Sequence, residues 1–295
     1  MDEDKIVCFG EILWDVFQSE KKLGGAPYNV ANSLKRLGAN VNLISRIGDD
    51  ELGKEILKKL NLNNINSHSI QIDRNYKTGS VKVNLDNDGV AQYEIAQEVA
   101  WDFIEILNKD IEMVSNSKAF IFGSLAARAA SYITLKKYLS ISRFCVFDLN
   151  LRSPFYTISK INELVKHSDM LKFNNEELFE IAKAVKSPFN TLEDHISFLS
   201  EKTNTKIICV TRGKFGAILF NKGKWFYNNG YKIKVKDTVG AGDSFLAVLV
   251  HGIIKNQPLQ ETLDKACAMG ALVAGSIGAN PDITEEKLSI FMKNG

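Results

Sequence analysis

Residues 30–60 read VANSLKRLGANVNLISRIGDDELGKEILKKL. The apolar residues of this stretch first recur at helical spacing and stop at Gly38, a residue type that commonly ends helices. Residues 41–45 then form a short apolar run that predicts a strand, and residues 52–60 return to helical spacing. This order of helix, strand and helix predicts an α/β unit in which the strand is covered by its neighbours.

The same alternation recurs along the rest of the chain. Further short runs of β-branched or aromatic residues, most of them followed by a helical pattern, lie at residues 5–9, 119–122, 144–147, 170–173 and 207–210. Strands that are apolar throughout and alternate with helices indicate a mostly parallel sheet with helices on both faces. We therefore expect an α/β fold built on a mostly parallel sheet sandwiched by helices.

Two segments depart from this alternation. One, at about 78–98, alternates between apolar and polar residues and contains Asn-Asp-Gly at 87–89, a typical hairpin turn. The other, at about 12–24, also has the pattern of a strand and a turn. We expect the two segments to form a small β-sheet that lies as a lid over one end of the main sheet. Because no linker separates them from the rest, residues 1–295 are predicted to form a single domain.

The composition excludes several classes of protein. The 295 residues include 37 Lys and Arg against 35 Asp and Glu, a formal charge of +2, so charge gives no reason to expect a nucleic acid or a membrane as a partner. The acidic start is unlike a secretory signal, and the scattered histidines form no zinc-binding pattern. Cysteines in apolar stretches without C-x-x-C spacing indicate reduced thiols and a cytoplasmic protein. They are Cys8, Cys145, Cys209 and Cys267.

The stretch 237–245, Asp-Thr-Val-Gly-Ala-Gly-Asp-Ser-Phe, leads into an apolar helix and carries the strongest chemical signal. Gly240 and Gly242, with Ala241 between them, allow several backbone N–H groups to point one way at the positive end of a helix dipole, which makes a site for an anion. Asp243 then stands beside that anion, where a carboxylate suits a general base that takes a proton from an attacking hydroxyl. The alternative is a glycine-rich helix start in which Asp243 only stabilises the dipole.

A second glycine-rich turn, Gly-Gly-Ala-Pro-Tyr-Asn, spans residues 24–29. Pro27 fits the first turn of a helix, and Gly24 and Gly25 allow a ligand to approach the main chain closely. Asn29, at the start of that helix, has an amide that both donates to and accepts from vicinal hydroxyls. The alternative is a tight turn followed by a helix cap.

These two turns resemble the two signatures of the ribokinase-like, or PfkB, family of carbohydrate kinases. The first signature is matched from Gly24 through Gly38 to Gly48, and the second from Asp237 to Asp243. The resemblance implies the ribokinase-like fold, and it continues through further motifs in the same order over most of the chain.

The resemblance also implies roles for these further motifs. Asp15 would contact the sugar, and residues 148–152, with Asp148 and Arg152, resemble the D-x-N-x-R element of the fructokinase branch. On the nucleotide side, Asn174 and Glu177 of an N-x-x-E element would organise magnesium and phosphate. The remaining nucleotide-side residues resemble a T-x-G-x-x-G turn and are Thr211, Gly213 and Gly216.

The activity implied by the resemblance is a magnesium-dependent transfer of phosphate from ATP to fructose, which gives fructose 6-phosphate. Asp15 and Asn29 would hold ring hydroxyls, and Asp243 would deprotonate the C6 hydroxyl. The loop near Asp237 and the Gly278-Ala279 segment resemble the region that binds potassium in some members. Besides ATP and Mg²⁺, a monovalent cation such as K⁺ is therefore a cofactor to be tested.

Several alternatives remain open from the sequence. The acceptor could instead be ribose, a 2-keto-3-deoxy sugar acid or a nucleoside, and a non-catalytic sensor of sugars or nucleotides could share the fold. A Rossmann dehydrogenase is excluded, because residues 10–12 after the first expected strand lack G-x-G-x-x-G. A homodimer could form through the lid, whose apolar face would carry Val81, Val83 and Leu85.

Individual residues have alternatives too. Arg152 could be a structural partner of Asp148 instead of a fixed cation for phosphate. Trp14 could belong to the core of the lid instead of stacking on a sugar. Lys172 is expected to be structural.

Overall fold

A computed structural model describes residues 4–85 and 91–294. Its main element is a nine-stranded sheet in the order β13-β12-β11-β10-β9-β8-β1-β4-β5. All neighbours from β11 to β5 pair in parallel, whereas β12 and β13 form an antiparallel edge. In sheet order, the strands span Lys224–Asn228, Ala217–Asn221, Ile207–Thr211, Met170–Asn174, Cys145–Asp148, Ala119–Gly123, Lys5–Phe9, Asn40–Gly48 and Ile70–Asp73.

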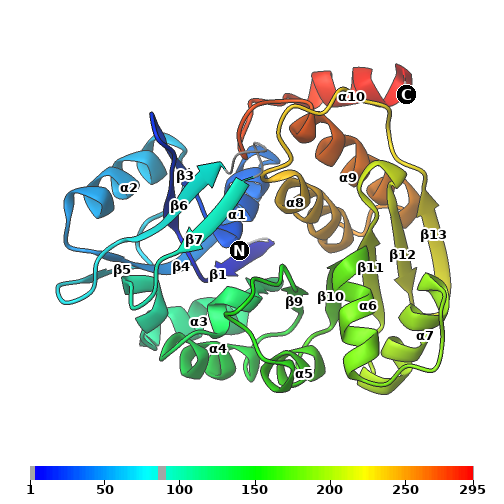
Figure 1. The fold of residues 1–295 in the computed structure, drawn as a ribbon, viewed down its shortest axis with the longest axis horizontal. Coiled ribbons are helices and arrows are strands. Elements are labelled where there is room, and N and C mark those ends of the chain that lie inside the picture. Colours follow the sequence, from blue (N-terminus) through cyan, green and yellow to red (C-terminus); the bar gives the residue numbers. More distant parts are fainter. Residues whose placement is uncertain (1–3, 86–90, 295) are drawn as a thin grey trace.

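Helices cover both faces of this sheet (Figure 1). One face is covered by α1 (Ala26–Arg36), α2 (Glu51–Leu62), α8 (Ala241–Ile254) and α9 (Leu259–Ala274). The other is covered by α3 (Asn108–Asn116), α4 (Ser131–Leu139), α5 (Ile158–Lys166), α6 (Asn175–Ala184) and α7 (Leu192–Thr203). The last helix, α10 (Glu285–Asn294), packs on α9. Short 3₁₀ turns span Ala100–Phe103 (η1), Ser124–Ala127 (η2) and Gly213–Phe215 (η3). Within the described residues, every helix is too short or too polar to cross a bilayer.

The core follows from the period of a buried strand. In β1, Ile6 and Cys8 face the layer of α1 and α8, whereas Val7 and Phe9 face the opposite helices. All four side chains are fully buried. Because both faces of the strand are covered, its sequence is apolar throughout, which confirms the parallel sheet expected from the sequence.

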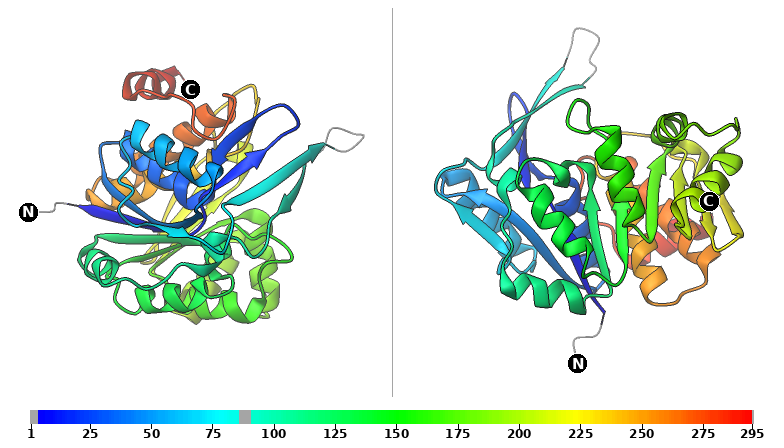
Figure 2. Two further views of the ribbon diagram at one scale, coloured as in Figure 1. Left: turned by 90° about the vertical axis from the view of Figure 1, so that its left-hand side faces the viewer. Right: turned by 90° about the horizontal axis from the view of Figure 1, so that it is seen from below.

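A separate four-stranded sheet has the order β3-β2-β6-β7. Its strands lie in the two expected segments, at Leu13–Val16 (β2), Lys21–Gly24 (β3), Gly79–Leu85 (β6) and Ala91–Ile95 (β7). The β6 and β7 strands project from the body of the molecule (Figure 2). The expected turn at 87–89 lies outside the described residues. We call these four strands the small sheet.

Trp14 belongs to the interior of this region. Its side chain is 1% exposed, and its Nε1 donates a hydrogen bond of 3.1 Å to the carbonyl oxygen of Leu52. A ring buried in this way is a packing residue, so Trp14 has no face free to stack on a sugar.

The contribution of the core to stability can be measured at Phe122 in β8, whose ring stacks on that of Phe147 in β9 with centroids 4.8 Å apart. Replacing the fully buried Phe122 by Ala is expected to lower the free energy of unfolding by about 3–5 kcal/mol through the cavity it leaves. Urea denaturation measures this change. Ile133→Ala, at a side chain that is 64% exposed, is the control and should change stability by less than about 0.5 kcal/mol. Equal losses in the two variants would contradict the assigned core.

Candidate active site

The expected site residues meet at the carboxyl edge of the parallel strands. Asp148 ends β9, Asn174 ends β10 and Thr211 ends β11. Register places Asn174 opposite Thr211, and Lys172 opposite Asp148. Ligands of open α/β sheets bind outside this edge, so these side chains stand where a ligand is expected.

The Gly-Ala-Gly turn delivers the start of α8 to the same edge. Gly240 has a φ of 77°, and a Cβ at this position would lie 2.4 Å from the carbonyl oxygen of Ala279. Only glycine fits such a conformation and such a contact. Ala241 is the first residue of α8 and Asp243 stands in its first turn, so the N-terminal N–H groups and Asp243 share one place, as the sequence predicts.

Asp243 is held by a side chain from another helix. Its Oδ2 accepts a hydrogen bond of 2.8 Å from Nδ2 of Asn29, a residue of α1 that is 4% exposed. Burial raises the pKa of Asp243 to about 6, and the nearby Asp148 carboxylate adds to the rise, while the Asn29 hydrogen bond opposes it. A carboxylate with this pKa is ionised at neutral pH and basic enough to accept a proton.

Asp15, in β2 of the small sheet, lies close to Asp243. Burial raises the pKa of Asp15 to about 6, with repulsion from Asp243 as the second cause. A Cβ at Gly24 would lie 2.2 Å from Oδ2 of Asp15, so glycine is needed where β3 passes this carboxylate. Gly25 follows with a φ of 102° and no space for a Cβ, which would be 2.5 Å from the carbonyl oxygen of Glu11. The second glycine turn therefore packs directly against the acidic group.

Glu11 is a site residue that the sequence analysis did not select. Its side chain is 2% exposed, and Oε1 accepts a hydrogen bond of 3.3 Å from the backbone of Ala26. Oε2 is buried without a hydrogen-bond partner among the described residues. Burial raises the pKa of Glu11 to about 7. The available signal was an acidic residue inside an apolar run directly after a strand.

Lys172, which is expected from the sequence to be structural, forms a buried ion pair. Its Nζ lies 2.8 Å from Oδ1 and 2.9 Å from Oδ2 of Asp148, and both residues are buried. Burial lowers the pKa of Lys172, but the Asp148 and Glu177 carboxylates outweigh that effect and raise it above its usual value. A Cβ at Gly242 would lie 3.5 Å from Nζ, so this ammonium group abuts the Gly-Ala-Gly turn.

This pairing changes the interpretation of the D-x-N-x-R element. Lys172 contacts both carboxylate oxygens of Asp148, and each oxygen keeps a further lone pair for the sugar contact that the resemblance implies. Arg152 is exposed and donates through Nη1 to the carbonyl oxygen of Leu151 at 3.1 Å. The partner of Asp148 is thus Lys172, and not Arg152 as the structural alternative had it.

Asn174 and Glu177 form a reciprocal cap at the start of α6. Asn174 Oδ1 accepts from the backbone of Glu177 at 2.9 Å, and Glu177 Oε2 accepts from the backbone of Asn174 at 2.8 Å. Glu177 Oε1 accepts from the backbone of Leu151 at 2.8 Å. Each oxygen retains one further lone pair. Magnesium bound to phosphates keeps several waters, and these oxygens fit contact with such waters better than a cage of direct ligands.

The T-x-G-x-x-G turn divides into two parts. Thr211 Oγ1 donates to the carbonyl oxygen of Phe173 at 3.3 Å, and Gly213 is exposed with open space around its Cα. Gly216 is buried, and a Cβ there would lie 2.1 Å from the carbonyl oxygen of Asn228. Gly213 therefore leaves space for a ligand, whereas Gly216 is required by packing against the end of β13.

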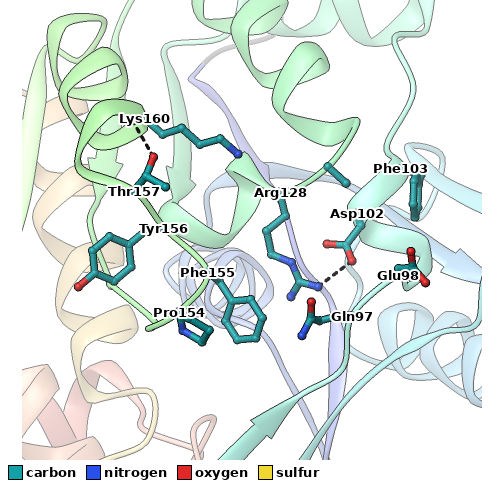
Figure 3. A pocket seen from close by; sticks show the side chains of 11 residues that line it. Gln97, Glu98, Asp102, Phe103, Arg128, Pro154, Phe155, Tyr156, Thr157 and Lys160 are labelled. Atoms are coloured by element: carbon teal, nitrogen blue, oxygen red, sulfur yellow. Dashed lines mark hydrogen bonds and ion pairs between the residues drawn. The ribbon is translucent and has the colours of Figure 1, made fainter.

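Two cavities lie near these residues. One of about 340 Å³ lies between the small sheet and the segment before α8, and its lining includes Asp15, Asp237 and Asn280. The other, of about 490 Å³, surrounds Arg128 and Asp102, whose side chains are joined by a hydrogen bond of 2.8 Å (Figure 3). Its described lining contains none of the expected site residues, whereas the first cavity is lined by Asp15.

Asp243, the buried Lys172 and the start of α8 lie together at one edge of the sheet, an arrangement that suits the binding of an anionic group. Comparison with known proteins identifies the family. Residues 1–286 match the model of the pfkB family carbohydrate kinases. The chain belongs to this family.

Individual relatives cover almost the whole chain. Fructokinase-2 of Solanum lycopersicum is 26% identical, over 98% of this chain and 96% of its own. An uncharacterized sugar kinase of Pyrococcus horikoshii is 27% identical with a TM-score of 0.81, over 98% of this chain and 97% of its own. A fructokinase double mutant of Vibrio cholerae, solved with fructose, ADP and potassium, shares the fold at a TM-score of 0.84 and 20% identity, over 99% of both chains.

The buried pair of Lys172 and Asp148 gives a prediction for stability. Lys172→Met should lower the free energy of unfolding by about 3–5 kcal/mol, because it leaves an uncompensated carboxylate in the interior. Adding Asp148→Asn to that variant should restore part of the loss. Urea denaturation of the wild type, both single variants and the double variant measures the coupling. A double variant whose loss equals the sum of the single losses would show that the two groups are not coupled.

Proposed function

We propose that this protein transfers the γ-phosphoryl group of ATP to a sugar hydroxyl, with fructose as the acceptor and fructose 6-phosphate as the product. The observation that carries the proposal is Asp243, a carboxylate with a raised pKa in the first turn of α8, beside the Gly-Ala-Gly turn and fixed by Asn29. The fructokinase relatives give the choice of sugar.

In the proposed reaction each group has one task. Asp15 and Asn29 hold ring hydroxyls, close to the turn at Gly24 and Gly25. Asp243 accepts the proton of the C6 hydroxyl while the oxygen of that hydroxyl forms a bond to the γ-phosphorus. The bond from that phosphorus to the bridging oxygen breaks, and ADP leaves with the electron pair. The N–H groups of residues 240–242 bind the transferred phosphoryl group.

Two cations of the protein balance the charge that builds up at this place. Lys172 already lies against Gly242 and is held by Asp148. Arg152 is exposed at the same edge and acts on Asp243 electrostatically. Because fixed cations need no reorganisation during the transfer, they favour the transition state over the separated reactants.

Magnesium is proposed to accompany ATP. Asn174 and Glu177 would hold it through its waters, since their free lone pairs fit that contact. The ion would neutralise phosphate charge. On the nucleotide side, Thr211 and Gly213 would lie along the phosphates or the ribose, and Gly216 supports the turn from behind.

A monovalent cation such as K⁺ is proposed next to the catalytic turn. Asp237 accepts from the backbone of Val239 at 3.0 Å and of Gly278 at 2.9 Å, which brings the two expected segments together. Carbonyl and carboxylate oxygens are the ligands that such hard cations prefer. The cation would fix the loop that carries Gly240.

We also propose that residues 1–295 act as one kinase domain, with the small sheet as a lid that excludes water from the transfer. Homodimerisation through the lid stays a prediction: Val81 is 5% exposed and packs within its own chain, and the side chains of Val83 and Leu85 lie outside the described residues. The four free, buried cysteines fit a cytoplasmic location.

The proposal is tested by ADP release from Mg-ATP with fructose, ribose, glucose, 2-keto-3-deoxygluconate, fructose 6-phosphate and adenosine as acceptors. Fructose is expected to give a kcat/KM about tenfold above the others. Asp243→Ala should lower kcat by about 100-fold or more, because the general base is lost. Glu51→Gln, at an exposed carboxylate, is the control. Full turnover of Asp243→Ala would refute the role of the base, and a preference for another acceptor would refute the choice of sugar.

The pH dependence of the wild type follows from the raised pKa of Asp243, about 6. The base works only when ionised, so kcat/KM for the sugar is expected to be constant at neutral pH and to fall as the pH drops below about 6. The fall is about tenfold per unit for Asp243 alone, and it is steeper where Asp15, whose pKa is also about 6, takes up a proton. Asp148→Asn removes the carboxylate that contributes to the rise, so it should move this fall to lower pH. We call this fall at low pH the acid limb. An acid limb at the same pH in Asp148→Asn as in the wild type would contradict the electrostatic coupling between Asp148 and Asp243.

A further inference from the structure

Three side-chain amides form a hydrogen-bonded chain that ends on Asp243. Asn32 Nδ2 donates to Asn280 Oδ1, Asn280 Nδ2 donates to Asn29 Oδ1, and Asn29 Nδ2 donates to Asp243 Oδ2, each over 2.8 Å. Asn29 and Asn32 belong to α1, whereas Asn280 lies in the segment between α9 and α10. This chain of amides therefore joins three parts of the sequence that are far apart: α1, the segment between α9 and α10, and the start of α8.

The direction of this chain is set by the carboxylate. Ionised Asp243 only accepts hydrogen bonds, so Asn29 must turn its NH₂ group towards it. The carbonyl oxygen of Asn29 then faces Asn280, which must present its own NH₂ group. If Asn280 could not donate, the hydrogen bond to Asp243 would be the only one of these two left to hold the amide of Asn29 in this orientation.

Asn280 is held firmly enough to act in this way. Two residues earlier, the backbone of Gly278 donates to Asp237 at 2.9 Å. The preceding Ala279 lies against Gly240, at the point where a Cβ would collide with it. On the other side, Arg36 of α1 donates to the carbonyl oxygen of Pro281 at 2.5 Å. The segment around Asn280 is thus clamped between α1 and the turn that precedes α8.

The buried environment gives the chain its effect. Asn29 is 4% exposed and Asn32 is 2% exposed, so an unpaired amide at either position is costly. Asn280 itself is partly exposed and lines the cavity of about 340 Å³. A hydrogen bond to an ionised group is stronger than one between neutral groups. The Asn29 bond lowers the pKa of Asp243 against the effect of burial, so the orientation of Asn29 changes how readily Asp243 loses its proton.

We propose that Asn280 is a positioning residue for the catalytic base: acting through Asn29, it holds Asp243 ionised and oriented towards the acceptor hydroxyl. This inference rests on the proposed function of Asp243. It assigns a catalytic consequence to a residue outside both glycine-rich turns.

Other charged groups also lie around Asp243. Among the described residues, none of them hydrogen-bonds to Asn280, so a shift caused at position 280 reports the amide chain. They are Glu11 after β1, Asp15 in β2, Asp148 in β9, Arg152 after β9 and Lys172 in β10.

The experiment compares three variants in pH profiles of kcat/KM for the sugar and of kcat. Asn280→Leu keeps a similar size and removes both hydrogen bonds. Asn280→Asp has nearly the same shape and still accepts from Asn32, but it cannot donate to Asn29 and favours the reversed amide. Ser33→Ala is the matched control, because it removes the contact of 3.2 Å between Ser33 and Ser244, which also joins α1 to α8.

We expect the acid limb of Asn280→Leu to move up by about one pH unit, since the hydrogen bond to the carboxylate is worth roughly that much. The rate should be about tenfold lower below the limb and should approach the wild type at high pH. The shift should be larger in Asn280→Asp, because its own charge adds to the effect, and absent in Ser33→Ala. KM for ATP should not change.

A loss of rate that is equal at every pH, with the limb unmoved, would overturn the proposal and leave Asn280 a purely structural role. An unchanged profile in both Asn280 variants would overturn it as well. A second measurement does not depend on turnover: carboxyl ¹³C NMR follows the titration of Asp243, whose signal is identified by its loss in Asp243→Asn. A raised pKa in Asn280→Leu supports the amide chain even if no acceptor is phosphorylated, and an unchanged pKa refutes it.

Discussion

Asp243 is a buried carboxylate in the first turn of α8, and the groups around it are arranged so that it remains ionised. Asp243 lies in an environment that raises its pKa to about 6. The positive end of α8, the Asn29 amide and the ammonium group of Lys172 all act against protonation. Without them, a buried carboxylate surrounded by Asp15 and Asp148 would be neutral and unable to accept a proton.

The parallel sheet makes this concentration of charge possible. Its parallel strands β8 to β11 are apolar apart from Lys172 and the residues at their carboxyl ends, and these ends lie at one edge. Lys172 is the exception, since it lies before the end of β10, where it is buried in an ion pair with Asp148. A buried ion pair is weak evidence for stability. Because Lys172 lies against Gly242, we attribute the pair to the proposed phosphoryl transfer instead.

The sequence predicted the fold well because the signal for it is local. The strand at residues 5–9, the helix after Gly240 and the two segments of the small sheet were all found where their periodicity placed them. The antiparallel edge of β12 and β13 was not predicted. Among the site residues, Asp243 and Asn29 met as the two glycine turns indicated, and Lys172 forms a structural ion pair as expected. Glu11 was not selected, because nothing in its neighbourhood in the sequence marks a buried charge as functional.

The sequence alone determined the class of fold, the family and the two glycine-rich turns in which the anion site and the base are proposed, since helical spacing, buried strands and glycine turns are properties of short stretches of chain. Only the tertiary structure decided which groups share the site. Asp148 meets Lys172 rather than Arg152, and Asn280 reaches Asn29 across 251 positions of the sequence. Such pairings depend on the distance and direction of side chains after packing, and these are set by how strands and helices cross, not by the order of residues within any one of them.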